Sequence, residues 1–171
     1  MGFTEISSRA IPGNVFDLIQ KRWMLISAGR MGGPGDWNTM TANWGGLGHL
    51  WNRDVAFAFV RPTRHSFLFM EKEELFTLSF FGDAWRGALE YCGRFSGRDH
   101  DKAAETGLKA IEAAPGAVAF EQAELIFVCR KIHAQDLDPK GFLDPAIHEH
   151  YDDDHHRLYI GQILKTLARE A

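Results

Sequence analysis

The sequence has little cysteine, no long apolar run and no large excess of charge of either sign. Cys92 and Cys129 are the two cysteines, and their spacing matches no CxxC motif, which is typical of buried, small apolar residues in a reducing compartment. The longest apolar run, VAFAFV at 55–60, is far shorter than a membrane span, and the opening MGFTEISSRA has neither a basic start nor an apolar signal core. We therefore expect a cytoplasmic protein with no membrane partner.

Charged residues are spread along the whole chain. There are 19 basic and 23 acidic residues, which gives a formal net charge of -4. This distribution supplies no extended cationic face for a phosphate backbone, so we expect no nucleic-acid partner. The length of 171 residues, the hydrophobic content of 45% and the lack of repeats or low-complexity linkers predict a single domain over residues 1–171.

Short apolar segments bounded by turn-forming residues predict a β-rich fold. Four of them are typical of strands packed in a barrel or sandwich: residues 22–29, 55–60, 75–81 and 123–132. Residues 156–168 mix strand and helix signals. We expect a strand there, because Tyr159 and Ile160 favour a pleated surface and Gly161 interrupts a helix.

Between the strands, the sequence predicts three short helices, over residues 63–74, 83–94 and 99–107. Thr63 and Asp83 are candidate N-caps for the first two, and Gly107 ends the third. Residues 34–38 are expected to form an open turn. The fold class is therefore α+β and β-rich, a closed or split β-barrel with peripheral short helices.

The segment NTMTANWGGLGHLWN, residues 38–52, has an unusual composition. A core strand is not expected here, because Thr39, Thr41 and Asn43 would carry unsatisfied donors into the interior and the glycines would weaken the strand. A solvent loop would not carry large apolar residues such as Trp44. The pattern favours a surface that touches something flat and partly polar, which small residues allow the backbone to approach closely.

A second segment, FVRPTRHSFLFMEK, has the composition of an anion site. Its buried strand ends at Arg61, the chain turns at Pro62, and the helix is expected to start at Thr63. Hydroxyls, guanidinium groups and free backbone N–H groups then converge, as a phosphate monoester requires, from Arg61, Thr63, Arg64 and Ser66. A capped helix with surface arginines is the alternative interpretation.

Taken together, these segments resemble the flavin reductase-like family of FMN-binding split-barrel proteins, in particular its flavoredoxin-like branch. The motifs that carry the resemblance are NTMTANWGG, VAFAFVRPTRHSFLFMEK, LFTLSFF, YCGRFSGRDHDKAAETGL and QDLDP, which follow in the same order and at similar spacing from about residue 22 onward. The resemblance implies an FMN-binding split β-barrel in which the segment from residue 38 runs along the isoalloxazine ring of the flavin.

The resemblance also implies which residues hold the flavin. The implied ring-binding residues are Asn38, Met40, Thr41, Ala42, Asn43 and Trp44. The implied ribityl-phosphate site comprises Arg61, Pro62, Thr63, Arg64 and Ser66, and the implied side loop comprises Arg98, Asp99 and Lys102. One departure is visible, because Arg94 and Phe95 stand where a small residue and a lysine are expected in this branch.

The function implied by the resemblance is that of an FMN-binding oxidoreductase. NADH or NADPH would supply hydride to the bound FMN, and electrons would then pass to a free flavin or to another acceptor such as a redox protein. A non-enzymatic FMN electron carrier of flavoredoxin type remains an alternative, as does a split barrel that binds haem or metal without flavin. Proteins of this kind are usually homodimers with sites at the interface, so we expect a homodimer.

The histidine-rich segment HEHYDDDHHR, residues 148–157, raises the question of a metal site. Adjacent histidines point in different directions and no HExxH-type pair is present, so we predict a solvated turn and no bound metal. His49 and His65 are interpreted as hydrogen-bonded structural histidines. His133, on an apolar strand, is a weaker candidate for reaching the flavin edge.

Overall fold

The structure is a computed structural model that describes residues 2–11, 13–33 and 35–170. Eight strands form the main sheet: β1 Phe3–Ile6, β2 Met24–Gly29, β3 Trp37–Ala42, β4 Gly45–Leu50, β5 Arg53–Val60, β6 Leu75–Phe80, β9 Leu125–Asp136 and β10 Arg157–Arg169. Their order is β3-β2-β6-β9-β10-β5-β4, with β1 paired to β10, and every pairing is antiparallel. A second sheet contains β7 Ala110–Ala114 and β8 Ala117–Phe120.

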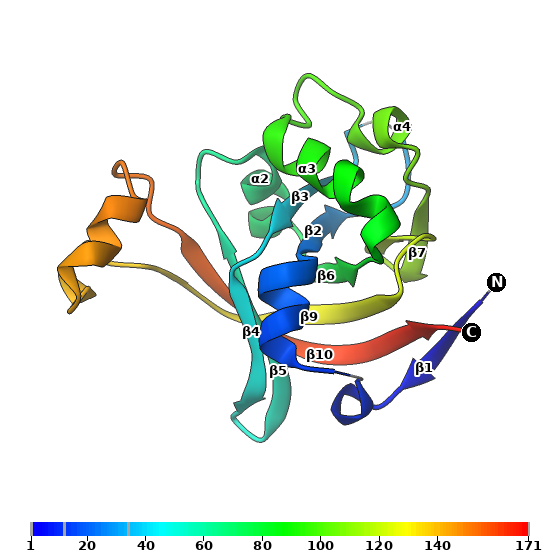
Figure 1. Ribbon diagram of the computed structural model, residues 1–171, viewed down its shortest axis with the longest axis horizontal. Helices are drawn as coiled ribbons and strands as arrows, with labels where there is room; N and C mark the ends of the chain where they lie inside the picture. Colours follow the sequence, from blue (N-terminus) through cyan, green and yellow to red (C-terminus); the bar gives the residue numbers. More distant parts are fainter. Residues whose placement is uncertain (1, 12, 34, 171) are drawn as a thin grey trace.

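Short helices accompany the main sheet. The α-helices are α1 Val15–Asp17, α2 His65–Lys72, α3 Arg86–Arg94 and α4 Lys102–Thr106, and α1 continues into a π-helical turn over Leu18–Arg22. Helices α2, α3 and α4 gather on one side of the sheet, at the top of Figure 1. The 3-10 turns cover Ser8–Ala10, Asp83–Trp85, Pro139–Gly141 and Pro145–His150. Helices α2 and α3 pack against β2 and β3, and this is the part of the fold that positions the candidate site. No helix among the described residues has the length and apolar character needed to cross a membrane.

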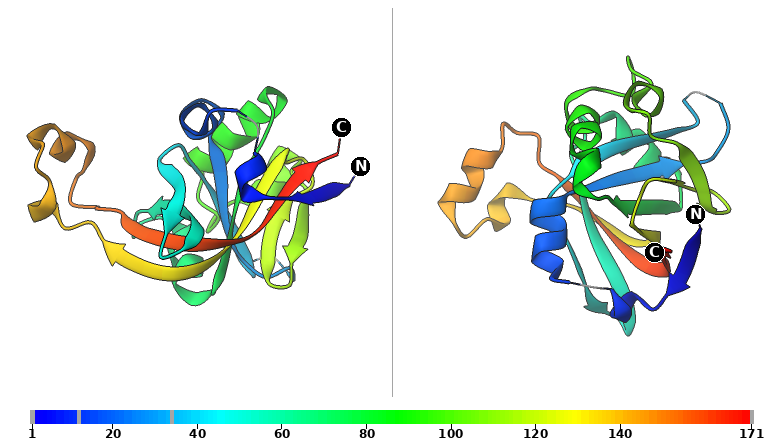
Figure 2. Two further views of the ribbon diagram at one scale, coloured as in Figure 1. Left: turned by 90° about the horizontal axis from the view of Figure 1, so that it is seen from below. Right: turned by 45° about the vertical axis from the view of Figure 1, so that its right-hand side comes forward.

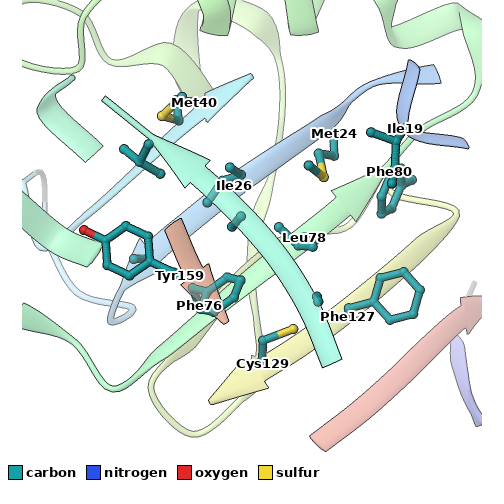
Figure 3. Packing of buried hydrophobic residues seen from close by; sticks show 14 of the residues in the cluster. Ile19, Met24, Ile26, Met40, Phe76, Leu78, Phe80, Phe127, Cys129 and Tyr159 are labelled. Atoms are coloured by element: carbon teal, nitrogen blue, oxygen red, sulfur yellow. The ribbon is translucent and has the colours of Figure 1, made fainter. Parts of the chain in front are cut away.

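The core lies inside the curved main sheet. Ile26 on β2, Leu78 on β6 and Phe127 on β9 belong to one buried cluster, as Figure 3 shows. Each of these side chains is 0–1% exposed. Leu25, Ile126 and Val128 of the same strands belong to a second buried cluster with residues of α3 and β8, so these strands contribute hydrophobic stabilisation from both faces.

Two bulges interrupt the long β9–β10 pairing. Register shifts lie between Ile160 and Gly161 and between Ile163 and Lys165 of β10. At Gly161 a Cβ atom would lie 2.5 Å from Cζ of Phe76, so the strand needs a glycine there for close packing. The strand prediction for this segment is thus confirmed, and the role of Gly161 is to admit an aromatic ring rather than only to interrupt a helix.

All five strands predicted from apolar segments are present, as β2, β5, β6, β9 and β10. The three predicted helices are also present, as α2, α3 and α4, each shorter than expected. Gly107 ends α4 in the left-handed conformation with φ 74°, as predicted. The short strands β1, β7 and β8 were not predicted.

The predicted helix caps are wrong. Arg64, in an extended conformation, is the N-cap of α2, and it makes no side-chain capping bond. Asp83 lies inside the 3-10 turn that precedes α3. The predicted open turn over 34–38 is shorter than expected, because β3 already begins at Trp37; Pro34 lies outside the described residues.

The prediction against a core strand near residue 38 is also wrong. Residues 37–42 form β3, in which Asn38, Thr39 and Met40 are buried. The polar side chains have partners, so their burial carries no unsatisfied donor: Asn38 Nδ2 donates to Ser66 Oγ at 2.8 Å, and Ser27 Oγ donates to Thr39 Oγ1 at 2.8 Å. Gly45 and Gly46 also lie in a strand, β4.

Residues 138–156, here called the arm, project from the body of the molecule beyond the ends of β9 and β10 (Figures 1 and 2). The arm contains two 3-10 turns, and at its base Leu137 N donates to the carbonyl oxygen of His156 at 2.9 Å. Its return toward the body brings residues 150–156 next to the start of α2.

Cys92 and Cys129 are both buried and both free thiols, as predicted. Burial raises the pKa of the Cys92 thiol to about 11, so the thiolate is a negligible fraction at neutral pH. These cysteines therefore act as small apolar residues of the core.

Candidate functional site

Two neighbouring cavities are lined by residues of β3. The first, which we call the cationic cavity, has a volume of about 290 Å³ and lies between β3, the start of α2 and the segment that joins α3 to α4. The second, the aromatic hollow, also has a volume of about 290 Å³. Met40, Arg61 and Arg64 line both, so the two cavities are next to each other. Together they have the size of an ordinary small-molecule site, roughly 300–1,000 Å³.

The cationic cavity has a strong excess of positive charge. Its basic lining residues are Arg61, Arg64, Arg94, Arg98 and Lys102. Asp154 is the acidic residue among the lining residues. A cavity with this charge balance attracts an anion and holds it by charge-assisted hydrogen bonds.

Lys102 is the most deeply buried of these cations, with 5% of its surface exposed. Its ammonium donates to the carbonyl oxygen of Thr39 and, at 3.4 Å, to that of Cys92. Both acceptors are neutral, and burial is the main reason that the pKa of Lys102 falls to about 8, with the charge of Arg64 adding to the effect. Within the described part of the chain, Lys102 therefore contacts backbone carbonyl groups and forms no ion pair.

His65, at the first position of α2, also lines the cationic cavity. Its Nδ1 atom is buried and has no hydrogen-bond partner, so the prediction of a hydrogen-bonded structural histidine is wrong at this atom. Burial lowers the pKa of His65, and the charges of Arg98 and Lys102 lower it further. Burial, together with the cations that make the cavity attractive to an anion, therefore favours the neutral imidazole.

The aromatic hollow is built from β3, β5 and the end of the arm. Trp44 and Phe59 line it together with His156, whose ring centroid lies 5.2 Å from that of Trp44. Burial is the first cause of the fall in the pKa of His156 to about 4, and the charge of Arg61 is the second. His156 Nδ1 lies 3.1 Å from the hydroxyl of Tyr151, so a neutral, oriented imidazole faces the hollow.

The arm is attached to the site by polar contacts. Arg61 Nη2 donates to the carbonyl oxygen of His150 at 2.9 Å, and Thr63 Oγ1 donates to Asp154 Oδ2 at 2.5 Å. The guanidinium of Arg61 also lies over the ring of Tyr151, 5.3 Å from its centroid. The prediction that residues 148–157 form only a solvated turn is therefore wrong, because this segment forms one wall of the site.

A metal site in that segment stays unsupported. In residues 2–11, 13–33 and 35–170, no three or more His, Cys, Asp or Glu side chains gather in a way that could hold a metal ion. That no metal binds to the segment stays a prediction.

Most predicted site residues come together. The cationic cavity is lined by Asn38, Met40, Arg61, Thr63, Arg64, Ser66, Arg98 and Lys102. The aromatic hollow is lined by Met40, Thr41, Ala42, Asn43, Trp44, Arg61 and Arg64.

A few predicted residues lie elsewhere. Asp99 lines a neighbouring cavity of about 620 Å³ that it shares with Arg98 and Lys102, and Pro62 lines none of the three. His133 is exposed, packs against Trp51 with ring centroids 5.9 Å apart and lines neither part of the site, so the structure does not support its reaching the flavin.

Sequence reasoning missed several lining residues: Phe59, His65, Cys92, Phe95, Ser96, Gly97, Asp154 and His156. Gly97 could have been noticed in the sequence, because it follows a serine in a run of turn-forming residues. In the structure a Cβ atom at this position would lie 2.0 Å from Asn38 Oδ1. Arg94, noted in the sequence only as a departure, adds a fifth cation to the cavity.

Comparison with known proteins gives a fold and no close sequence relative. No protein-family model and no curated protein matches this sequence. An FMN-binding domain of a flavin reductase-like enzyme from Shewanella baltica is 16% identical, with a TM-score of 0.69 over 97% of this chain and 76% of that chain. A flavoredoxin from Methanosarcina acetivorans is 18% identical, with a TM-score of 0.67 over 96% of this chain and 77% of that chain.

A third similar structure is an NADH:FAD oxidoreductase from Streptomyces globisporus, which is 11% identical, with a TM-score of 0.63 over 86% of this chain and 75% of that chain. At such identities these likenesses establish a shared fold. The main sheet is not closed, since β3 and β4 at its two ends do not pair with each other. The predicted β-rich split barrel with short peripheral helices is therefore confirmed, and so is the resemblance to flavin reductase-like proteins at the level of the fold.

Proposed function

We propose that this chain, which has the split-barrel fold of flavin reductase-like FMN-binding domains, binds FMN and acts as an oxidoreductase. In this proposal a reduced nicotinamide, NADH or NADPH, is the electron donor, and a flavin or another acceptor receives the electrons. The observation that carries the proposal is the cationic cavity next to the aromatic hollow, because one ligand with a phosphate at one end and a flat ring at the other matches both.

The residues of the cationic cavity fit a phosphate group. Lys102 is a buried cation with neutral partners, so an incoming dianion compensates a charge that the protein leaves uncompensated. Ser66 Oγ accepts from Asn38 and keeps its own hydrogen available for donation to a phosphate oxygen. Arg64 Nη1 donates to the carbonyl oxygen of Gly93 at 3.0 Å, which fixes the guanidinium at the cavity wall.

The residues of β3 fit the polar edge of a flavin ring. Within the described residues this strand is at the edge of the sheet and pairs with β2 alone, so main-chain groups on its other side can face a ligand. Thr41 and Ala42 are small enough to allow close approach, and Trp44, 42% exposed, presents an aromatic surface to the same hollow. These groups position a ring by shape and hydrogen bonding.

When bound, FMN supplies the capacity to accept a hydride and to release electrons one or two at a time. The chain's contribution is to bind, orient and shield. The cations hold the charged end, Trp44 and Phe59 exclude water from the hollow, and His156 stays neutral at physiological pH because of its low pKa. The similarity to the NADH:FAD oxidoreductase fold supports a nicotinamide donor.

The test is an absorption spectrum of the purified protein, recorded after FMN is added and again after NADH or NADPH is added. We expect a protein-bound flavin spectrum that bleaches with a nicotinamide and recovers with an acceptor. A colourless protein that gives no calorimetric heat with FMN would overturn the proposal. Flavin that stays bound and is reduced by dithionite but by neither nicotinamide would instead indicate an electron carrier.

The proposal includes a homodimer. Phe16, Leu143 and Trp51 are 82%, 96% and 56% exposed, and a second copy would cover such apolar surface. An apolar cavity of about 650 Å³ also opens beside the arm, lined in part by Phe16, Trp44 and Tyr151. Light scattering at micromolar concentration should give twice the mass of the 19.3 kDa chain, and a monomer mass would contradict this part of the proposal.

A further inference from the structure

Asp154 lines the cationic cavity, which the proposed function assigns to the phosphate group of the ligand. It accepts a hydrogen bond from Thr63 Oγ1 at 2.5 Å, and Asp154 is the acidic residue among the residues that line the cavity. Asp154 comes from the arm, 91 residues further along the chain than Thr63. An acid from a distant segment therefore lines the same cavity as five basic side chains.

Asp154 and a phosphate would compete for the hydroxyl hydrogen of Thr63. A threonine hydroxyl has one hydrogen, so Thr63 cannot donate to Asp154 and to a phosphate at the same time. Arg61, the other residue that contacts the arm, donates through Nη2 to the carbonyl oxygen of His150. The arm thus engages the one hydrogen of the Thr63 hydroxyl, whereas Arg61 keeps further N–H donors for a phosphate.

The negative charge of Asp154 also opposes phosphate binding. A carboxylate in the cavity partly neutralises the arginines and repels a second anion, and both effects weaken phosphate binding. In the proposed function the ring end of the ligand lies in the aromatic hollow, and the described residues that line this hollow include no acid. The effect of Asp154 should therefore fall on the phosphate and not on the ring.

We propose that Asp154 is an internal competitor for the ligand's phosphate group and a determinant of how strongly the site prefers FMN to riboflavin. The inference rests on the proposed function for its choice of ligand, and on the Thr63–Asp154 contact for its mechanism. Phosphate binding displaces the carboxylate from Thr63 and frees that part of the arm. Removal of the charge strengthens FMN binding, which is the opposite of what loss of an ordinary binding residue does.

The experiment compares Asp154→Asn with a matched control, Asp153→Asn. Asparagine at 154 keeps an oxygen that can accept from Thr63 and removes the charge. Asp153 is exposed and has φ 58°, a conformation that asparagine tolerates, so the control removes the same charge one residue away without altering the backbone. Affinities for FMN and riboflavin are measured by titration, and inorganic phosphate is tested by its effect on the melting temperature.

Asp154→Asn should bind FMN on the order of tenfold more tightly than the wild type, with riboflavin affinity unchanged, as expected for removing one like charge from a partly screened site. Asp153→Asn should change neither affinity by more than about twofold, because its charge is exposed and screened. Unchanged or weaker FMN binding by Asp154→Asn, or an equal gain in Asp153→Asn, would overturn the inference.

The phosphate measurement separates this inference from the proposed function. If neither flavin binds to the wild-type protein, the proposed function fails, and the result with inorganic phosphate still decides the role of Asp154. A larger stabilisation of Asp154→Asn than of the wild type by phosphate supports competition by the negative charge of Asp154, because asparagine still accepts the hydrogen bond from Thr63. Equal stabilisation of the two proteins refutes it.

Discussion

The buried ammonium of Lys102 leads to the prediction that FMN binding takes up a proton near pH 8. Burial lowers the pKa of Lys102 to about 8, so about half of the ligand-free protein carries a neutral amine at that pH. A phosphate dianion in the cationic cavity favours the ammonium and raises the pKa. Uptake should therefore approach about half a proton per FMN at pH 8 and be small at pH 7, where the ammonium is already formed. Affinity should fall as the pH rises above 8.

The lowered pKa of Lys102 also means that its buried charge reduces the free energy of unfolding at neutral pH. Lowering the pKa from 10.5 to about 8 corresponds to about 3 kcal/mol for keeping the charge in this buried position at neutral pH. The unfolded chain retains the proton up to pH 10.5 and the folded chain only up to about pH 8, so the free energy of unfolding should rise with pH between these values. Lys102→Met removes the buried charge at similar volume, and the ligand-free variant should be more stable than the wild type at pH 7 while binding FMN more weakly.

Calorimetry in buffers of different ionisation enthalpy measures the proton uptake directly. The two controls are Lys102→Met titrated with FMN and the wild-type protein titrated with riboflavin, and neither should take up a proton at pH 8. The reasoning is refuted if wild-type protein binds FMN without proton uptake at pH 8, or if Lys102→Met shows the same uptake, since another group would then be titrating.

Three further predictions concern single side chains. Arg64→Ala should weaken FMN about tenfold to a hundredfold and riboflavin much less, and an equal loss for both flavins in fluorescence titrations would mean that its bond to Gly93 matters only for the fold. Trp44→Ala should weaken both flavins by similar factors, roughly tenfold, because it touches the shared ring, and selective loss of FMN would contradict its place in the aromatic hollow. Gly161→Ala should lower the free energy of unfolding by about 1–3 kcal/mol in urea melts because a methyl group would collide with Phe76, and an unchanged midpoint would show that the ring can move.

The parts of the site that the sequence predicted are those assembled from neighbouring residues. Arg61, Thr63 and Arg64 lie between the end of β5 and the start of α2, so a local reading of strand, turn and helix was enough to place them together. Asp154 and His156 enter the same site from about 90 residues further along the chain, and their surrounding sequence is typical of a solvated turn. Nothing local indicates that such a turn closes onto a distant cavity.

The errors in local structure have the same origin. Thr39 was expected to be too polar for a core strand, because its partner, Ser27, is 12 residues away and lies outside the segment itself. Thr63 was expected to cap α2, but its hydroxyl donates to Asp154 instead. In both cases a tertiary hydrogen bond decides where a small polar side chain lies, and propensities describe only the alternatives available within a few residues.

The two bulges between β9 and β10 restrict how the length of this chain can change during evolution. One bulge places an extra residue, Ile132, on β9, and the other places an extra residue, Leu164, on β10, so the second restores the register that the first had shifted. Deleting Leu164 alone would leave part of β10 offset by one residue and turn its core-facing side chains outward. Insertions and deletions in this strand pair should therefore be tolerated only as compensating pairs, whereas exposed parts of the arm such as those near Leu143 can vary in length without altering the barrel.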